Sequence, residues 1–354
     1  MSFQTLQRND LLDFYKGIAI ILVILGHTFQ YVFNPTDFDD ALGFRLIYSF
    51  HMPLFILLSG MTASNWITKM HEPHSFDDLI KVSLARIQKT TIRLLIPFIS
   101  WTIFKFWFLG LAGNLPEYLL RVMRSPDDSL WFLLCLYYCV IAIIVFQALV
   151  ELCCKINLIK NLLVKSSAKR NSQAKLIIIF LIWLLIRHTI SDEYGLSLLK
   201  QYFGFFIFGI FFELFLTQKI NFWVSLIASL AFITLAPYWH RLEAYNLLIH
   251  PLDNLYIRAL SKYFSLIVAI SGSLMAISIC KFIYEYGNRI FIKFISHCGK
   301  ISLGVYAIQF YCIDSWPPVI APLMISVIIS SLILYIPVLK TVMLGEPFKK
   351  IARQ

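Results

Sequence analysis

Charged residues are scarce in this sequence: Asp, Glu, Lys and Arg make up only 14% of its 354 residues. A soluble domain carries about 25% charged residues, so this deficit excludes an ordinary soluble protein. Hydrophobic residues account for 59% of the chain and aromatic residues for 16%. The composition therefore indicates an integral membrane protein whose surroundings are the lipid bilayer.

The sequence also lacks an even, spaced cysteine framework, internal repeats and a soluble segment of useful size. Its seven cysteines lie in apolar runs or basic loops, so we expect no structural disulfides. No His or Cys stands at a metal-ligand spacing from His27, so we expect no metal. No small-residue cleavage site follows the first apolar run, which predicts a retained span. We predict one integral-membrane domain over residues 1–354.

Long apolar runs are abundant, and we predict ten membrane spans from them, because a spanning helix needs about 20 mostly apolar residues. The fold class is therefore all-α, a polytopic transmembrane helix bundle of about ten spans. The fifth and ninth runs are short. The predicted spans cover residues 14–33, 44–63, 92–111, 130–150, 175–190, 201–217, 222–239, 263–283, 300–316 and 319–339.

The net charge of +11 is distributed unevenly along the chain. With a cytoplasmic N-terminus, the inner segments hold 20 Lys or Arg residues and the outer segments hold 8. Cytoplasmic loops of membrane proteins carry an excess of Lys and Arg, so we predict both termini in the cytoplasm. The same rule accounts for the basic charge, so we expect no nucleic acid partner.

Two ionisable residues stand out in the first span. Lys16 and His27 are eleven residues apart, which on a helix places them on one face with a rise of about 16 Å. His51 opens the second span at about the same depth as His27. Ionisable groups inside spans are rare and usually functional. The alternative is a purely structural pair of hydrogen-bonded histidines with a snorkelling lysine.

The stretch "LDFYKGIAIILVILGH", followed by "FHMPLFILLSG", resembles the opening of the membrane acyltransferase family 3. The family's first span carries Arg or Lys, ten residues and then His, as Lys16 and His27 do. Four later stretches resemble family segments in the same order. The chain departs from the family at Gln309, where many relatives place a second histidine. Those later stretches are "RLLIPFISW", "SLWFLLCLYY", "YFGFFIFG" and "ISLGVYAIQFY".

Members of this family have about ten spans and transfer acyl groups, usually acetyl, onto sugars of bacterial surface polysaccharides. The resemblance therefore implies an O-acyltransferase of the bacterial inner membrane. Its donor would be acetyl-CoA or another acyl-CoA from the cytoplasm. Its acceptor would be a hydroxyl of a cell-surface glycan or of a lipid-linked saccharide precursor.

The chemistry assigns roles to the candidate site residues. Histidine has an ordinary pKa of about 6.5, so His27 is suited to act as the general base that deprotonates the acceptor hydroxyl. A covalent acyl-imidazole relay stays open. His51, or else Ser59, would orient the imidazole or stabilise the oxyanion. The donor phosphates would be bound by cations at the cytoplasmic face, namely Lys16, Arg93, Lys89 and Arg86. Arg86 and Lys89, part of a basic set with altered family spacing, can equally be orientation charges.

The main alternative is a membrane transporter that exports a glycan or lipid with an intramembrane histidine relay. Transporters often contain internal repeats and broken helices, which the sequence does not show. A third interpretation, a scaffold without catalysis, leaves the paired histidines unexplained.

Overall fold

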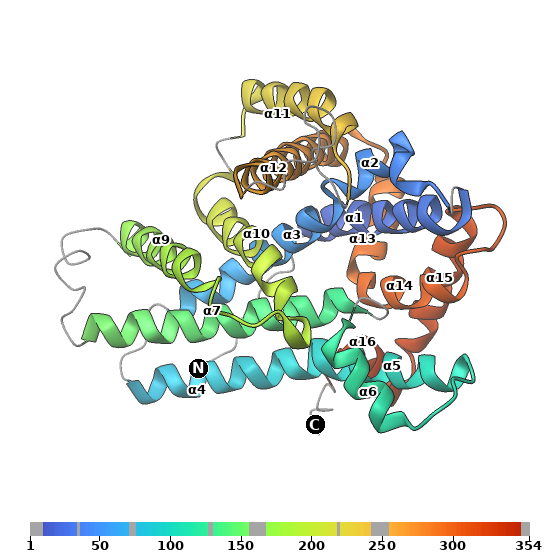
Figure 1. The fold of residues 1–354 in the computed structure, drawn as a ribbon, viewed down its shortest axis with the longest axis horizontal. Helices are drawn as coiled ribbons and strands as arrows, with labels where there is room; N and C mark the ends of the chain where they lie inside the picture. The colour runs from blue at the N-terminus through green and yellow to red at the C-terminus, as the bar shows by residue number, and fades with distance from the viewer. Residues whose placement is uncertain are drawn as a thin grey trace. The chain divides into compact units, whose positions relative to one another are not determined.

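The computed structural model describes residues 10–33, 36–70, 76–126, 130–155, 168–217, 220–241 and 255–347. Most of the basic loop between the fourth and fifth predicted spans therefore lies outside the described residues. Within those ranges the regular secondary structure is helical and no strand occurs, which confirms the all-α prediction (Figure 1).

The chain divides into two compact units. Unit 1 comprises Met1–Leu58 with Gln218–Ser331, and unit 2 comprises Ser59–Thr217 with Leu332–Gln354. The single domain over residues 1–354 stays a prediction.

Unit 1 is built from the N-terminal segment and a later segment of the sequence. It holds α1 (Asp10–Thr28), the π-helix η1 (Phe29–Phe33), η2 (Phe38–Asp40), α2 (Leu42–Tyr48), the start of α3 (His51–Met70), α11 (Phe222–Leu235), η7 (Ala236–Tyr238), α12 (Leu255–Tyr286), α13 (Arg289–Lys300), α14 (Ser302–Ile308), η8 (Gln309–Tyr311) and most of α15 (Ile320–Ile333).

Unit 2 is built mainly from the middle of the sequence. It holds the rest of α3, α4 (Phe76–Thr90), the π-helix η3 (Thr91–Leu95), α5 (Ile96–Phe108), α6 (Leu115–Arg124), α7 (Trp131–Lys155), α9 (Ala168–Ile186), η5 (Glu193–Gly195), α10 (Leu196–Phe215) and α16 (Pro337–Leu344).

Six helical stretches in the described part of the chain are long and apolar enough to cross a membrane, and they match six predicted spans. Three shorter apolar helices match the fifth, seventh and tenth predicted spans. The total of ten spans and the cytoplasmic termini stay predictions. The six stretches are Asp10–Phe33, Leu42–Ile67, Asp77–Phe108, Trp131–Cys154, Glu193–Phe215 and Tyr263–Tyr286.

The ninth predicted span, residues 300–316, differs from its expected form. Only α14 and η8 are helical there, because the backbone leaves the helical region at Ile301 (φ −105°, ψ 17°) and at Cys312 (φ −135°, ψ 16°). Together α14 and η8 cover Ser302–Tyr311, about half the length that a spanning helix needs. Hydropathy measures apolar content and does not detect these backbone breaks.

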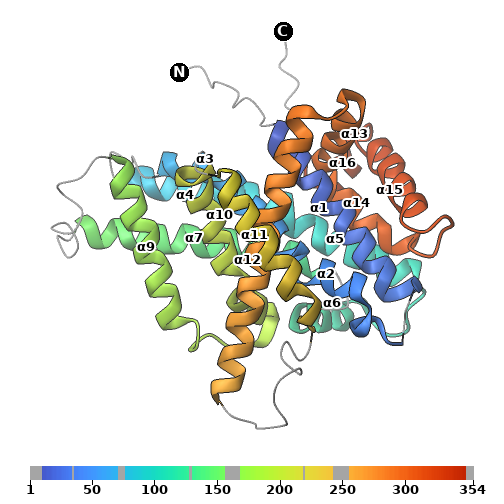
Figure 2. The same cartoon turned by 90° about the horizontal axis from the view of Figure 1, so that it is seen from above.

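In unit 1, α13 packs closely along α1, as both views show (Figures 1 and 2). Two glycines permit this contact. A Cβ atom on Gly17 would lie 2.0 Å from the carbonyl oxygen of Ile295, and one on Gly299 would lie 1.8 Å from that of Asp13. Small residues let helix backbones approach in membrane proteins, where packing rather than the hydrophobic effect drives association. These glycines therefore fix the position of α1.

An aromatic core holds together α7, α9 and α10 of unit 2. Trp183 meets Phe203 edge to face with ring centroids 4.9 Å apart, and Phe146 lies 5.8 Å from Phe203. All three rings are buried. Lys175 of α9 also forms a largely buried ion pair with Glu151 of α7. Aromatic packing and an ion pair thus both join α7 to α9.

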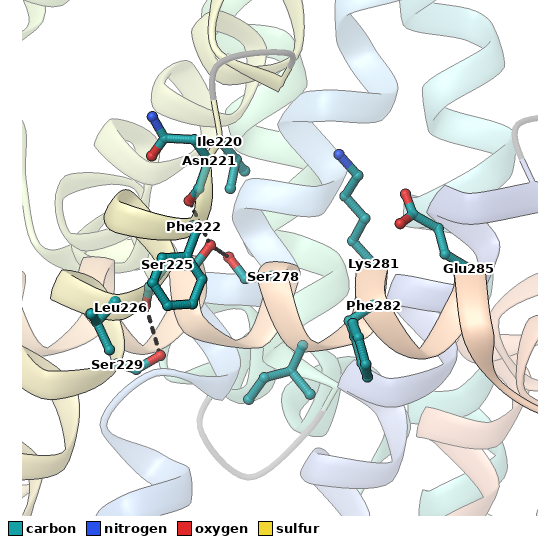
Figure 3. Close-up of a pocket in the computed structure, with 11 residues that line it drawn as sticks. Ile220, Asn221, Phe222, Ser225, Leu226, Ser229, Ser278, Lys281, Phe282 and Glu285 are labelled. Carbon is teal, nitrogen blue, oxygen red and sulfur yellow. Dashed lines mark hydrogen bonds between the residues drawn. The ribbon is translucent and has the colours of Figure 1, made fainter.

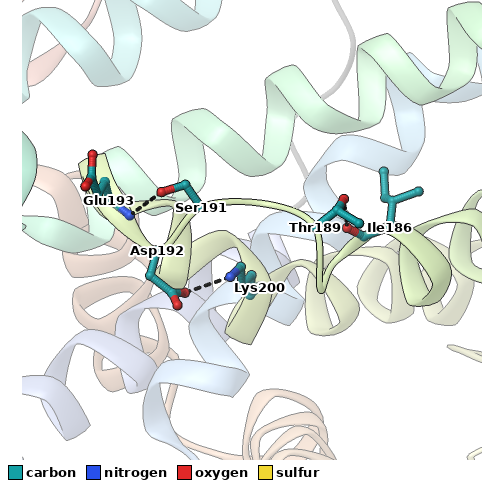
Figure 4. Close-up of polar contacts among 6 residues, drawn as sticks. All are labelled: Ile186, Thr189, Ser191, Asp192, Glu193 and Lys200. Carbon is teal, nitrogen blue, oxygen red and sulfur yellow. Dashed lines mark hydrogen bonds and ion pairs between the residues drawn. The ribbon is translucent and has the colours of Figure 1, made fainter.

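The link between α9 and α10 is ordered by local polar contacts (Figure 4). Lys200 Nζ lies 2.8 Å from Asp192 Oδ1, and the backbone N–H of Glu193 donates to Ser191 Oγ. Thr189 Oγ1 donates to the Ile186 carbonyl at the end of α9. The short connection makes α9 and α10 neighbours in unit 2.

The close contact of α1 with α13 leads to a stability prediction. Gly299→Ala should lower the midpoint of thermal unfolding in detergent, because overpacking costs about 1–3 kcal/mol even where backbone does not block the added atoms. The matched control is Gly204→Ala in α10, where the nearest atom to a Cβ would be 3.8 Å away. The control should unfold at or slightly above the wild-type midpoint, because Ala favours helix. A Gly299→Ala midpoint equal to wild type would contradict the packing argument.

Candidate active site

His27 lies near the end of α1, one turn from the point where the helix widens into η1. Its side chain is buried, with 9% of the residue exposed. The α1 helix is continuous from Lys16 to His27, so the predicted spacing of about 16 Å along one face holds. Lys16 is half-buried. Single π turns inside α-helices occur frequently at functional sites.

His51 is the first residue of α3 and is almost fully buried. Its Nδ1 lies 3.0 Å from the carbonyl oxygen of Ile47. A carbonyl only accepts hydrogen bonds, so Nδ1 carries the hydrogen. In the neutral ring Nε2 is then left as an acceptor. The histidine therefore has one defined tautomer.

Tyr48 lies against both imidazoles. Its ring centroid is 6.4 Å from that of His27 and 4.6 Å from that of His51. The two histidines are also close enough to interact electrostatically. The structure thus brings the two predicted catalytic residues into one cluster, as expected from their matching depth.

Glycine and glutamine set the position of the Tyr48 ring. A Cβ on Gly26 would lie 2.8 Å from Tyr48 Cε2, so only glycine lets the edge of the ring approach α1 this closely. The Tyr48 hydroxyl donates a hydrogen bond to Gln30 Oε1. This tyrosine is therefore held at one edge of its ring and at its hydroxyl.

Gln309 approaches His27 from η8. It is fully buried, its Nε2 donates to the Tyr306 carbonyl (3.2 Å), and its side chain lies within interaction range of the His27 ring. Phe310 packs on the same imidazole with centroids 4.7 Å apart. Sequence reasoning noted Gln309 only as a departure from the family. Its place after the tyrosine of the late segment was the available signal.

One ring nitrogen of His27 has no hydrogen-bond partner among the described residues. His27 Nδ1 is buried, and no described residue meets hydrogen-bond geometry with it. A buried polar atom without a partner costs about 1–3 kcal/mol. Gln309 Oε1, on the side chain that approaches the same ring, is likewise buried without a hydrogen-bond partner among the described residues.

Three of the four predicted donor-binding cations lie together in unit 2. The charges of Arg86, Lys89 and Arg93 are close enough to repel one another. The guanidinium carbon of Arg86 lies 4.2 Å from the centroid of the Trp66 ring, while Lys89 and Arg93 are exposed. Lys16 belongs to unit 1. We refer to Arg86, Lys89 and Arg93 as the cationic cluster.

The backbone around Arg93 is irregular for a clear reason. Arg93 lies in η3, and Pro97 lacks the N–H that would donate to the Arg93 carbonyl in a regular helix. Gly345, with φ +65°, packs against that residue: a Cβ there would lie 2.2 Å from the Arg93 carbonyl oxygen. The C-terminal end of α16 thus supports the backbone that carries Arg93.

Among the described residues, no group of three or more His, Cys, Asp or Glu side chains could hold a metal ion. Ser59, the alternative partner for the base, lies eight residues beyond His51, about 12 Å along α3.

Comparison with known proteins adds three findings. Residues 9–344 match a family model described as an acyltransferase domain, acyltransferase family 3. The nodulation protein NolL of Sinorhizobium fredii (strain NBRC 101917 / NGR234) is 34% identical over 137 residues, which cover 36% of this chain and 33% of the relative. NolL of Mesorhizobium japonicum (strain LMG 29417 / CECT 9101 / MAFF 303099) is 34% identical over 128 residues, covering 36% of this chain and 30% of the relative.

These matches span about a third of the length of each curated relative. No solved structure matches the chain. The family match, by contrast, covers nearly the whole sequence, and it decides between the enzyme and transporter interpretations. Several of the described helices are long and apolar enough to cross a membrane, and the chain belongs to acyltransferase family 3.

Proposed function

We propose that this enzyme moves an acetyl or other short acyl group from cytoplasmic acyl-CoA to a hydroxyl of a cell-surface glycan or its lipid-linked precursor in the bacterial inner membrane. His27 acts as the general base. The observation that carries the proposal is the buried His27 ring, whose Nδ1 has no hydrogen-bond partner among the described residues. A base needs a lone pair that no protein donor occupies, and this nitrogen has one when the ring is protonated on Nε2.

The transfer needs no covalent enzyme intermediate. His27 takes the proton from the acceptor hydroxyl, and the hydroxyl oxygen forms a bond to the thioester carbonyl carbon. The carbon–sulfur bond then breaks, the acyl group stays on the acceptor oxygen, and the departing CoA sulfur receives the proton from the imidazolium. A positioned base of this kind contributes about 10²- to 10⁴-fold in rate.

His51 fits the role of an orienting group better than that of an oxyanion donor. The hydrogen on its Nδ1 is used by the Ile47 carbonyl, so the neutral ring has no second N–H to offer. Its Nε2 can only accept. Tyr48, which touches both rings, fixes their separation.

Gln309 serves as a positioning residue for His27. Its amide is buried beside the imidazole, and its Nε2 is already held by the Tyr306 carbonyl. Its Oε1 has no hydrogen-bond partner among the described residues, so this oxygen is free to accept from the imidazolium that forms during proton transfer. A hydrogen bond to a charged group contributes about 1.5–3 kcal/mol.

The donor site draws on the cationic cluster and on Lys16. CoA carries several phosphates, and Arg or Lys side chains bind phosphate oxygens through charge-assisted hydrogen bonds. Lys89 and Arg93 are exposed and mutually repulsive, so an anionic ligand would relieve their repulsion. The stacking of Arg86 on Trp66 orients its guanidinium without using its N–H groups.

The first test removes the base. Membranes that contain His27→Ala should transfer no detectable label from radiolabelled acetyl-CoA to an envelope glycan fraction, at unchanged protein abundance. The matched control is His297→Ala, an exposed histidine of α13 whose Nε2 lies 3.1 Å from Ser331 Oγ, and it should retain activity. Equal transfer by His27→Ala and wild type would reject His27 as the base.

The second test separates positioning from packing. Gln309→Met keeps the size of the side chain but removes the amide, so kcat/KM should fall about 10- to 100-fold, the value of one charged hydrogen bond. Gln309→His restores a polar group and should recover part of that loss. If Met and His variants lose activity equally while thermal stability is unchanged, the polar role of Gln309 is wrong.

The third test concerns the donor. Arg93→Ala and Lys16→Ala should each raise the KM for acetyl-CoA about ten-fold, because each removes a charge-assisted contact to phosphate. Lys16→Arg should be tolerated. Lys81→Ala is the control, an exposed lysine on α4, the helix that carries Arg86 and Lys89. If Lys81→Ala changed the KM as much as Arg93→Ala, the effect would come from general surface charge and the proposed phosphate contact would be wrong.

A further inference from the structure

A groove of about 500 Å³ lies between α11 and α12 of unit 1 (Figure 3). Its walls are apolar: Phe222 and Leu226 come from α11, and Ile279 and Phe282 come from α12. Phe222 and Phe282 are 70% and 65% exposed, so no described part of the chain covers them. A groove of this size is within the range of about 300–1,000 Å³ that small ligands occupy.

The floor of the groove is polar, but its serine hydroxyls already donate hydrogen bonds within the protein. Ser225 Oγ donates to Ser278 Oγ at 2.9 Å, and Ser278 Oγ donates to the Leu274 carbonyl at 2.8 Å. Ser229 Oγ donates to the Ser225 carbonyl at 2.8 Å. The bond between Ser225 and Ser278 joins the two helices. All three hydroxyl hydrogens are used within the protein, so none is left for a ligand. The body of the groove therefore selects for an apolar chain.

The mouth of the groove carries opposite charges. Lys281 and Glu285 are one helical turn apart on α12 and extend to the same side of it (Figure 3). In the described part of the chain neither forms an ion pair, with the other or with a third residue. Side chains four residues apart on a helix have Cβ atoms about 5–6 Å apart. A cation and an anion thus stand side by side, both available to a ligand.

The groove also lies at a level suited to a lipid headgroup. Lys281 and Glu285 stand in the last turns of the membrane-spanning stretch Tyr263–Tyr286, where the hydrocarbon region gives way to the interface. The apolar walls extend from these charges toward the middle of the stretch. An amphiphile would therefore place its charged end at the mouth and its chain along Phe222, Leu226 and Phe282.

We propose that this groove binds a phospholipid whose headgroup carries a primary ammonium, as in phosphatidylethanolamine. The phosphate is bound by Lys281 and the ammonium by Glu285, and an acyl chain fills the groove. A choline headgroup cannot donate a hydrogen bond to Glu285, and a glycerol headgroup has no cation for it. The paired charges therefore favour ethanolamine over both.

The experiment uses the full-length protein purified in detergent and exposed to an equal mixture of phosphatidylethanolamine, phosphatidylcholine and phosphatidylglycerol with identical acyl chains. Native mass spectrometry then counts the lipids retained. Wild type should retain the ethanolamine lipid about ten-fold over the other two, the value of one charge-assisted contact. Preferential retention of phosphatidylglycerol, or equal retention of all three lipids, would overturn the proposal.

Three variants locate the effect. Glu285→Gln should abolish the preference for ethanolamine over choline, and Lys281→Ala should weaken retention of both. Ser229→Phe should fill the groove and lower retention of all three lipids.

The matched controls are Lys293→Ala on α13 and Glu117→Gln on α6. Both remove an exposed charge, and both variants should behave as wild type. A Glu285→Gln protein with an unchanged preference would place any bound lipid elsewhere. The acetyl-transfer assay is separate, so failure here leaves the proposed function intact.

Discussion

The position of His27 depends on the backbone contact between α1 and α13. At Gly17 and Gly299 the two helices approach so closely that a single added methyl group would overlap a carbonyl oxygen. In a bilayer the lipid tails are as apolar as the side chains, so such close packing replaces the hydrophobic effect as the force that orders helices. With α1 fixed at Gly17, the imidazole about three turns further on has a defined position and direction in unit 1.

The side chains that surround this imidazole are mostly aromatic, and few of them are polar. Tyr48 and Phe310 lie against His27, and Gln309 is the polar side chain brought to it from η8. Packed rings leave little room for water beside the imidazole. Under the proposed function, this exclusion would protect the acyl group from hydrolysis.

Much of this site was predictable from sequence because it follows from helix geometry. The eleven-residue spacing of Lys16 and His27 is a property of local structure, and the continuous helix α1 has it; the expected closeness of His51 to His27 is also found. The approach of Gln309 was not predictable in the same way, because it depends on how α14 and η8 pack against α1. The ninth span failed as a regular long helix for a similar reason, since the backbone breaks at Ile301 and Cys312 leave no mark on hydropathy.

The ion pair between Glu151 and Lys175 has a consequence for biogenesis. During synthesis α7 leaves the ribosome before α9, so for a time the Glu151 carboxylate has no countercharge. Glu151 lies near the end of the apolar stretch Trp131–Cys154, and its carboxylate meets the Lys175 ammonium only when both helices are present. The two helices therefore complete their contact only after the whole segment from α7 to α9 has been synthesised.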